Sequence, residues 1–203
     1  MRHLRVFLAV GLVAGGVLLV FAAAPASAGL GLACPASTST PFAGFGDRAH
    51  YAYLPDGGFE NGAAGWKLSS GARVVAGNEP FYVHHRGDAH ALSVPKGGMA
   101  TSPGMCISLL SSKMRFVATG QGSAKGQAGK VKVQIVYHGL LSSVLGILDG
   151  GTISANGQWQ PSPEVGMLGG VLPLLTSSVQ FRFVGTDGTV RIDDVYLDPM
   201  KSA

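Results

Sequence analysis

The chain has 203 residues, of which 31 are Gly, 11 are Pro and only 13% are charged, and its formal net charge is +4. Lys and Arg are scattered along the chain without a run, which excludes the charge pattern of a nucleic-acid-binding protein. Gly and Pro follow no period and separate short apolar runs, which excludes collagen and favours an all-β domain.

The N-terminal segment has the pattern of a secretory signal. Two arginines precede a continuous apolar run over Val6–Ala24, and the small residues Ala26 and Ala28 follow Pro25. We expect cleavage after Ala28, so residues 1–28 are predicted to be a signal peptide and the protein to be secreted or held at the cell surface. The alternative is an uncleaved membrane anchor, since the run approaches the ~20 residues that span a bilayer.

The remaining 175 residues suffice for one domain with its own core. We expect it to be a monomer with no nucleic-acid partner and, after signal cleavage, no membrane contact. Residues 29–50 form a polar, Gly- and Pro-containing arm that Phe42 and Phe45 would dock to the domain.

Two cysteines, Cys34 and Cys106, are the only ones in the chain. An even count in an exported protein predicts one disulfide, which would contribute about 4 kcal/mol by closing a long loop. The alternative is a pair of free buried thiols. No Cys-x-x-Cys spacing indicates a redox or metal role.

The first half of the domain contains short strand candidates. Two of them, 66–69 and 72–77, are predicted to form a hairpin around Ser70-Gly71, and a turn at 95–98 separates two others. The candidates are Tyr51–Leu54, Gly58–Glu60, Trp66–Ser69, Ala72–Gly77, His90–Val94 and Met99–Ser102.

The second half contains clearer strands, because apolar residues recur at every second position with one apolar face. These strands are Lys113–Thr119, Lys130–His138, Ser178–Gly185 and Thr189–Leu197. In the last one the apolar parity changes at Asp193-Asp194, which predicts a β-bulge that re-aims a carboxylate. The apolar segments Leu140–Leu148 and Val165–Leu175 are interpreted as loops or helical turns that cover one end of the domain.

Two strings frame the domain: Gly57-Gly58-Phe59-Glu60 with Gly65-Trp66 near its start, and Arg191-Ile192-Asp193-Asp194-Val195 at its end. Together they resemble the galactose-binding-like superfamily, which includes many carbohydrate-binding modules of secreted bacterial proteins. The resemblance covers about residues 51–199 and implies a jelly-roll β-sandwich of antiparallel strands, with Trp66 in the core.

The resemblance also implies a structural Ca²⁺ between the Phe-Glu segment and the last strand. The matching positions are Gly58, Glu60 and Asp193. Calcium requires six to eight oxygen ligands, which carboxylates and backbone carbonyls supply. The alternative is that Glu60 and Asp194 cap strand ends or pair with Arg48 or Arg191.

Ligand contacts are expected in two places. Tyr82 and His84 lie in a loop segment suited to contact a ligand, although solvated loop residues are the common case; a metal site among His84, His85, Asp88 and His90 is a weaker alternative. Polar residues on the outward positions of three strands would form one basic sheet surface if those strands are neighbours. The candidates on that surface are Arg115, Lys132, Gln134 and Arg182.

The sequence thus predicts a secreted, non-catalytic module that recognises carbohydrate or another cell-envelope polymer. One alternative is a structural or protein-interaction module that docks through the apolar segments; a hydrolase using the 84–90 region is a further one. No Gly-x-Ser-x-Gly motif is present. Eleven acids in the whole chain give little basis for a paired-carboxylate glycosidase.

Overall fold

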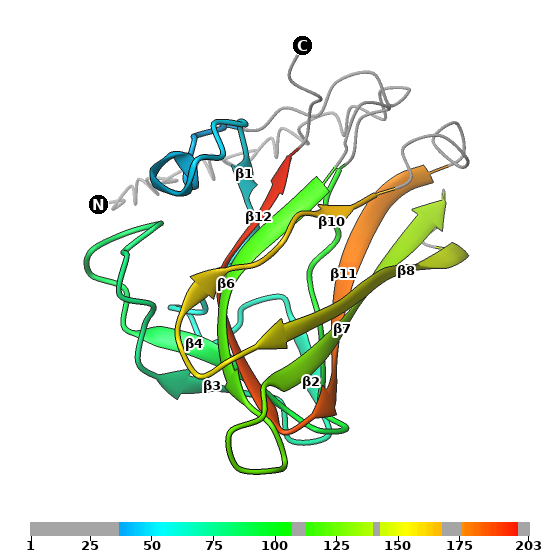
Figure 1. The fold of residues 1–203 in the computed structure, drawn as a ribbon. Helices are drawn as coiled ribbons and strands as arrows, with labels where there is room; N and C mark the ends of the chain where they lie inside the picture. The colour runs from blue at the N-terminus through cyan, green and yellow to red at the C-terminus, as the bar shows by residue number, and fades with distance from the viewer. Residues whose placement is uncertain (1–36, 107–112, 140–142, 168–175, 199–203) are drawn as a thin grey trace, which may run out of the picture.

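The computed structural model of the chain describes residues 37–106, 113–139, 143–167 and 176–198. Two antiparallel sheets stack face to face as a β-sandwich (Figure 1), which confirms the predicted fold class. Within the described residues, no helix has the length and apolar character needed to cross a membrane. Residues 1–28 and Cys34 lie outside the described ranges, so the signal peptide and the Cys34–Cys106 disulfide stay predictions.

The two sheets are of unequal size. The seven-stranded sheet has the order β10 (Val165–Gly166), β6 (Lys113–Gln121), β12 (Thr189–Asp198), β4 (His90–Pro95), β3 (Arg73–Ala76), with β1 (Ala52–Tyr53) paired to β12 and β9 (Gln160–Pro161) paired to β6. The five-stranded sheet has the order β2 (Lys67–Ser69), β5 (Met99–Thr101), β11 (Thr176–Asp187), β7 (Gly129–Gly139), β8 (Val144–Ala155).

The core fills the space between the sheets because each long strand turns alternate residues inward. Strand β7 buries Val131, Val133 and Ile135 completely. Its neighbour in the same sheet, β11, buries Phe181 and Phe183 beside them. Aromatic rings add edge contacts across the layers, and the Trp66 ring stacks on Phe183 with its centroid 6.1 Å away. The Trp66 indole N–H donates to the Pro55 carbonyl at 2.9 Å, so the predicted core role of Trp66 is confirmed.

Three local predictions are wrong. The segments around Ser70-Gly71 form no hairpin, because β2 pairs with β5 in one sheet and β3 pairs with β4 in the other. Residues 58–60 form no strand and lie in a turn region, with Phe59 at φ 63°; the N-terminal strand that pairs with β12 is β1. Much of the predicted covering segment 140–148 belongs to strand β8, which pairs with β7.

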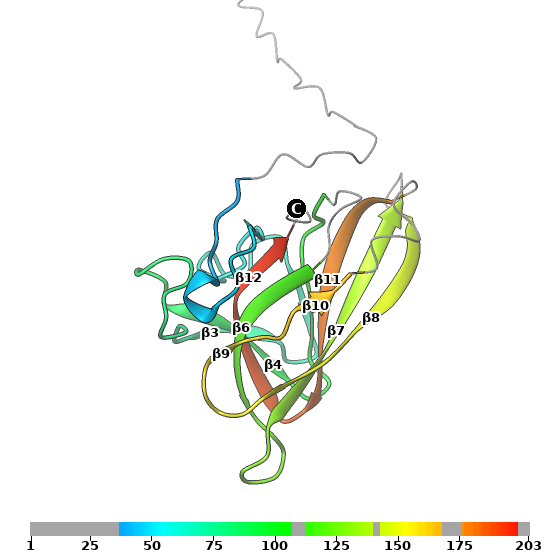
Figure 2. The same cartoon turned by 45° about the horizontal axis from the view of Figure 1, so that its top comes forward.

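The N-terminal arm covers part of the outer face of the seven-stranded sheet. Figure 2 shows it beside β12, and its short 3-10 helix η1 (Ala43–Phe45) follows the fully buried Phe42. The Phe42 ring makes edge contacts with Tyr51 and Tyr196 at centroid distances of 5.3 and 5.7 Å. Phe42 therefore docks the arm as predicted, while Phe45 stays 40% exposed and makes an edge contact with the Phe81 ring.

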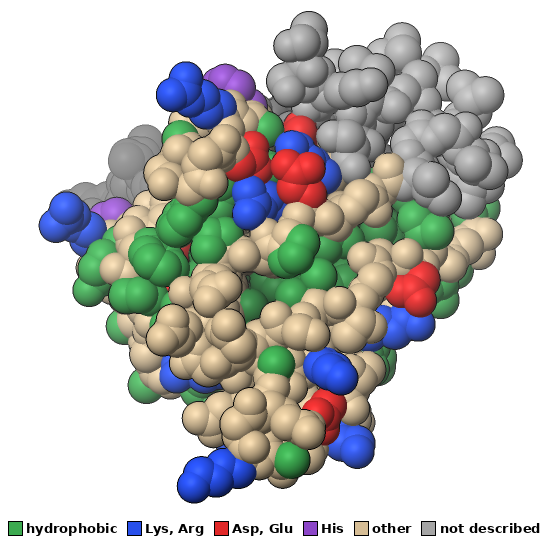
Figure 3. Space-filling model, in the orientation of Figure 1, with side chains coloured by type: hydrophobic (Ala, Val, Ile, Leu, Met, Phe, Trp, Pro, Cys, Tyr) green, Lys and Arg blue, Asp and Glu red, His purple; other side chains and the backbone are tan. Residues whose placement is uncertain are grey.

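An ion pair fastens the same arm to β6. Arg115 donates to the Asp47 carboxylate at 2.8 Å and to the Ser162 carbonyl, and its guanidinium lies over the Phe42 ring. The Tyr51 hydroxyl donates to the same Asp47 oxygen at 2.6 Å. Acidic and basic side chains are interspersed over the face shown in Figure 3, so this face presents no single charge sign.

Replacing Arg115 with alanine should lower the free energy of unfolding by about 2–3 kcal/mol, because the partly buried Asp47 carboxylate and the Ser162 carbonyl lose the hydrogen bonds that Arg115 donates. Urea unfolding measures the change. Arg73→Ala, at an exposed arginine of β3, is the matched control and should change stability little. Equal stability of the two variants would contradict the arm-fastening role.

Asp47 should also make stability depend on pH in acid. Burial raises the pKa of its carboxyl, but hydrogen bonds from Tyr51, Arg115 and the Ala49 N–H outweigh this and hold the pKa at about 2. A depressed pKa contributes stability that is complete above the ordinary value of 3.8 and is lost as the pH falls through 2. The stability difference between the parent chain and Asp47→Asn should therefore shrink between about pH 6 and about pH 2 in unfolding curves.

Candidate functional site

A row of polar side chains crosses the outer face of the five-stranded sheet. Strand register places Arg182 of β11 opposite Thr101 of β5 on one side and opposite Gln134 of β7 on the other. Lys67 of β2 lies opposite Thr101, and Asp149 of β8 opposite Gln134, so the row extends across all five strands. Neighbouring strands are about 4.8 Å apart, which gives the row a length of about 19 Å.

Contacts hold this row in place while leaving it partly exposed. The Arg182 Nε–H donates to the Thr101 hydroxyl at 3.4 Å, and Lys132 pairs with Asp149 at 2.7 Å. The hydrogen bond from Lys132 keeps the pKa of Asp149 below its usual value. Lys132, Gln134 and Arg182 thus share one face, as predicted for neighbouring strands.

Arg115 does not belong to that face. Its strand, β6, lies in the seven-stranded sheet, whereas β7 and β11 lie in the other one. The outward period-two positions of two strands look alike in the sequence, whichever sheet contains them. The structure therefore separates Arg115 from the other three residues and engages it with Asp47 and Ser162.

The loop between β3 and β4, residues 77–89, is organised by a buried glutamate. Glu79 is 1% exposed, and its carboxylate accepts hydrogen bonds from the Phe81 and Val83 N–H groups. Between them, Tyr82 adopts a left-handed φ of 52° and is 48% exposed. Tyr82 is thus exposed on a loop whose backbone is held in place, and ligand contact by Tyr82 stays a prediction.

The predicted bulge in β12 is confirmed, and it lies where the same loop packs. The pairing with β6 shifts between Asp193 and Tyr196, and Asp194 has a φ of 50°. The bulge directs both aspartates at this loop: Asp193 accepts from the Glu79 N–H and Asp194 from the His84 N–H, each at 3.1 Å.

Both aspartates are fully buried, and this affects their ionisation. Burial raises the pKa of Asp193 to about 9, and the neighbouring charge of Asp194 adds to the rise. Burial also raises the pKa of Asp194, with further repulsion from Glu79 and Asp88.

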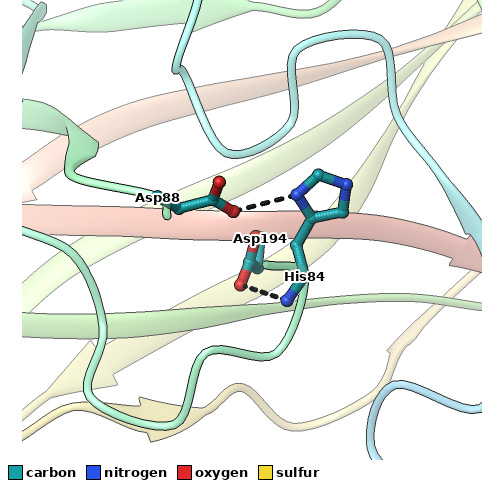
Figure 4. A group of neighbouring side chains, drawn as sticks. All are labelled: His84, Asp88 and Asp194. Carbon is teal, nitrogen blue, oxygen red and sulfur yellow. Dashed lines mark hydrogen bonds and ion pairs between the residues drawn. The ribbon is translucent and has the colours of Figure 1, made fainter. Parts of the chain in front are cut away.

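Three side chains converge here, two from the 77–89 loop and one from β12. His84 Nδ1 lies 2.9 Å from an Asp88 oxygen, and potential ligand atoms of His84, Asp88 and Asp194 all lie within 4.8 Å of one another (Figure 4). The His84 ring stacks on Tyr53 of β1, with centroids 3.9 Å apart and an interplanar angle of 3°. The imidazole therefore has a defined orientation even though it is 38% exposed.

A pocket of about 600 Å³ adjoins this cluster. Residues 37–41 of the arm line it together with Tyr53, Val83, His84 and Tyr196. It combines aromatic rings with hydroxyl groups beneath the arm.

The residues predicted for calcium are only partly brought together. Gly58 lies beside both aspartates, where a Cβ atom would come 2.6 Å from the Tyr53 hydroxyl and 3.2 Å from Asp194 Oδ1. The Glu60 carboxylate instead accepts from the Ala89 and His90 N–H groups and contacts the His90 ring at 2.9 Å. No contact among the described residues joins Glu60 to Asp193, and calcium binding stays a prediction.

Sequence reasoning overlooked several residues of these sites. Asp194 was read as a strand-end cap, and Asp88 only as one of four local metal-type residues. The sequence pattern did not indicate Thr101 or Asp149, because the strand of Thr101 is short and that of Asp149 is Gly-rich, and neither shows clear alternation. The one available signal for Asp194 was the parity change in the last strand.

No family profile and no curated protein matches the chain by sequence. Similar solved structures include the CBM22-1 and GH10 modules of a Clostridium thermocellum endo-1,4-beta-D-xylanase, complexed with xylohexaose (TM-score 0.52, 12% identity, 72% of this chain and 28% of that one). Others from Paenibacillus barcinonensis are a tandem CBM22-1–CBM22-2 domain (0.51, 11%, 75% and 46%) and a CBM22-2 xylan-binding domain (0.50, 9%, 71% and 98%). The expected likeness to jelly-roll carbohydrate-binding modules is thus confirmed, and at these identities it shows the fold.

Replacing Glu79 with alanine should destabilise the chain by about 1–3 kcal/mol and loosen residues 77–89, because the Phe81 and Val83 N–H groups lose their acceptor. Hydrogen exchange should show faster exchange at these two amides. Glu164→Ala, which removes an exposed carboxylate paired with Lys113, is the control. Unchanged exchange at residues 81 and 83 would contradict the role assigned to Glu79.

Proposed function

We propose that this chain is a secreted, non-catalytic module that recognises carbohydrate, and that it binds a polysaccharide along the polar row of the five-stranded sheet. The observation that carries the proposal is the alignment of Lys67, Thr101, Arg182, Gln134 and Asp149 across five paired strands.

The chemistry of the row suits an extended polyhydroxylated ligand. Amide, hydroxyl, carboxylate and guanidinium groups offer both donors and acceptors to sugar hydroxyls. Sites on paired strands hold such groups at fixed spacing, which lowers the entropy lost on binding. Lys132 and Arg182 would additionally attract an acidic polymer.

Fold likeness supports the proposal without establishing it. The similar Clostridium thermocellum structure is complexed with xylohexaose, and the similar Paenibacillus barcinonensis domain is described as xylan-binding. One fold supports many functions, so xylan itself is only one member of the panel to be tested.

Three further parts of the proposal come from the sequence. The chain would reach its ligand after removal of residues 1–28, the Cys34–Cys106 disulfide would tie the arm to the domain, and Ca²⁺ would bind near Gly58, Glu60 and Asp193. Peptide mass mapping before and after reduction tests the first two.

The binding test uses affinity electrophoresis against neutral and acidic polysaccharides and cell-wall fractions. Arg182→Ala and Gln134→Ala should each weaken binding about tenfold, the equivalent of one or two hydrogen bonds. Arg73→Ala removes the same charge from the other sheet and should leave affinity unchanged. Equal retention of all three variants would overturn the assignment of the row as the binding face.

One observation favours a protein-interaction module as the second candidate. Val144, Leu145 and Ile147 of β8 are 58%, 37% and 53% exposed, and β8 ends the described strand order of its sheet. An apolar end strand is a common docking edge. Absence of polysaccharide binding together with self-association that Ile147→Lys abolishes would support this candidate.

A further inference from the structure

Carboxylates gather beneath the 77–89 loop without a matching set of cations. Glu79, Asp193 and Asp194 are at most 1% exposed, and the Asp88 side chain is 8% exposed. Among the described residues, no ion pair joins any of these four acids to Lys or Arg. The Lys and Arg side chains that form ion pairs do so with Asp47, Glu164 and Asp149. A buried carboxyl group is costly to ionise, so it either stays protonated or takes a compensating cation.

Hydrogen bonds satisfy most of these oxygens but leave one open. Glu79 and Asp193 each use both oxygens to accept backbone N–H groups. Asp194 accepts from the His84 N–H with Oδ2, whereas its Oδ1 is fully buried and has no hydrogen-bond partner. A buried polar atom without a partner requires an explanation, and a bound ion is one that the surrounding side chains can be tested for.

Asp194 lies beside other potential metal ligands. Figure 4 shows it next to His84 and Asp88, and an Asp88 oxygen contacts His84 Nδ1. Two ligands in a tetrahedral zinc site lie about 3.3 Å apart, given metal–ligand bonds near 2.0–2.1 Å. The 2.9 Å separation of His84 and Asp88 is close to that, and the overall 4.8 Å spread requires only a small movement of side chains.

We propose that His84, Asp88 and Asp194 form a site for one divalent transition-metal ion of the zinc class. One imidazole and two carboxylates match the ligand preference of zinc-type ions, whereas calcium takes oxygen ligands only. This set differs from the Gly58, Glu60 and Asp193 positions considered for calcium, because it takes the second aspartate of the bulge and two residues of the 77–89 loop.

The surroundings suit an ion with an open coordination position. Three protein ligands leave a fourth place for water or another oxygen ligand. His84 also lines the pocket that adjoins the cluster, together with the Ser and Thr residues at positions 37–40. Stacking on Tyr53 sets the imidazole plane before the metal arrives, which reduces the ordering cost of binding.

The test is isothermal titration of the chelator-treated protein with Zn²⁺ and, separately, with Ca²⁺, in the absence of any polysaccharide. We expect one Zn²⁺ per chain. His84→Phe, which keeps the ring stacked on Tyr53 but removes both nitrogens, should weaken zinc binding more than about tenfold. His50→Phe, at an exposed histidine outside the cluster, should have no effect.

Asp194→Asn and Asp88→Asn should each reduce zinc affinity by a similar factor. Asp88 is less buried than Asp194, so Asp88→Asn tests the carboxylate ligands even if Asp194→Asn fails to fold. Co²⁺ provides an optical readout, since its visible absorption is intense only in four-coordinate sites and should disappear in His84→Phe. Zinc binding that survives His84→Phe overturns the proposal, as does a site that takes Ca²⁺ alone. Because no glycan enters the experiment, its failure leaves the carbohydrate proposal untouched.

Discussion

The irregularity at Asp193 and Asp194 is the constraint on which this half of the sandwich depends. β12 pairs with β1, β4 and β6, so a bulge within it affects the centre of the seven-stranded sheet. A regular strand would turn one aspartate into the core. The bulge and the left-handed φ of Asp194 instead direct both carboxylates at the backbone of the 77–89 loop.

That arrangement exchanges apolar packing for a buried polar network. Glu79 contributes in both directions, since its N–H donates to Asp193 and its carboxylate accepts from two N–H groups of its own loop. Such a network defines a loop conformation well when every member is satisfied and is costly when one is not. The open oxygen of Asp194 is therefore the point at which an added ion changes the balance most.

The two outer faces of the sandwich have consequently different roles. On the seven-stranded sheet, Phe42, Tyr51 and the Arg115–Asp47 pair fasten the arm over β6 and β12, which uses that surface for stability. On the five-stranded sheet, the row through Arg182 and Gln134 stays partly exposed and joins all five strands in register. The proposed recognition face and the proposed metal site are thus built from different elements and can be separated by substitution.

The sequence by itself determined the class of fold and the inward face of the long strands. Period-two alternation in β7 and β11 depends only on side-chain direction, so Val133 and Phe181 were correctly placed in the core. The parity change likewise predicted the bulge. Tertiary structure decided which strands are neighbours, because local sequence pattern carries no information on pairing across a sandwich. Arg115 therefore lies in one sheet and Arg182 in the other, and β2 and β3 belong to different sheets instead of forming a hairpin. The meeting of His84 and Asp88 with Asp194, more than a hundred residues away, has the same origin, since long-range contact and burial arise only when the sheets assemble.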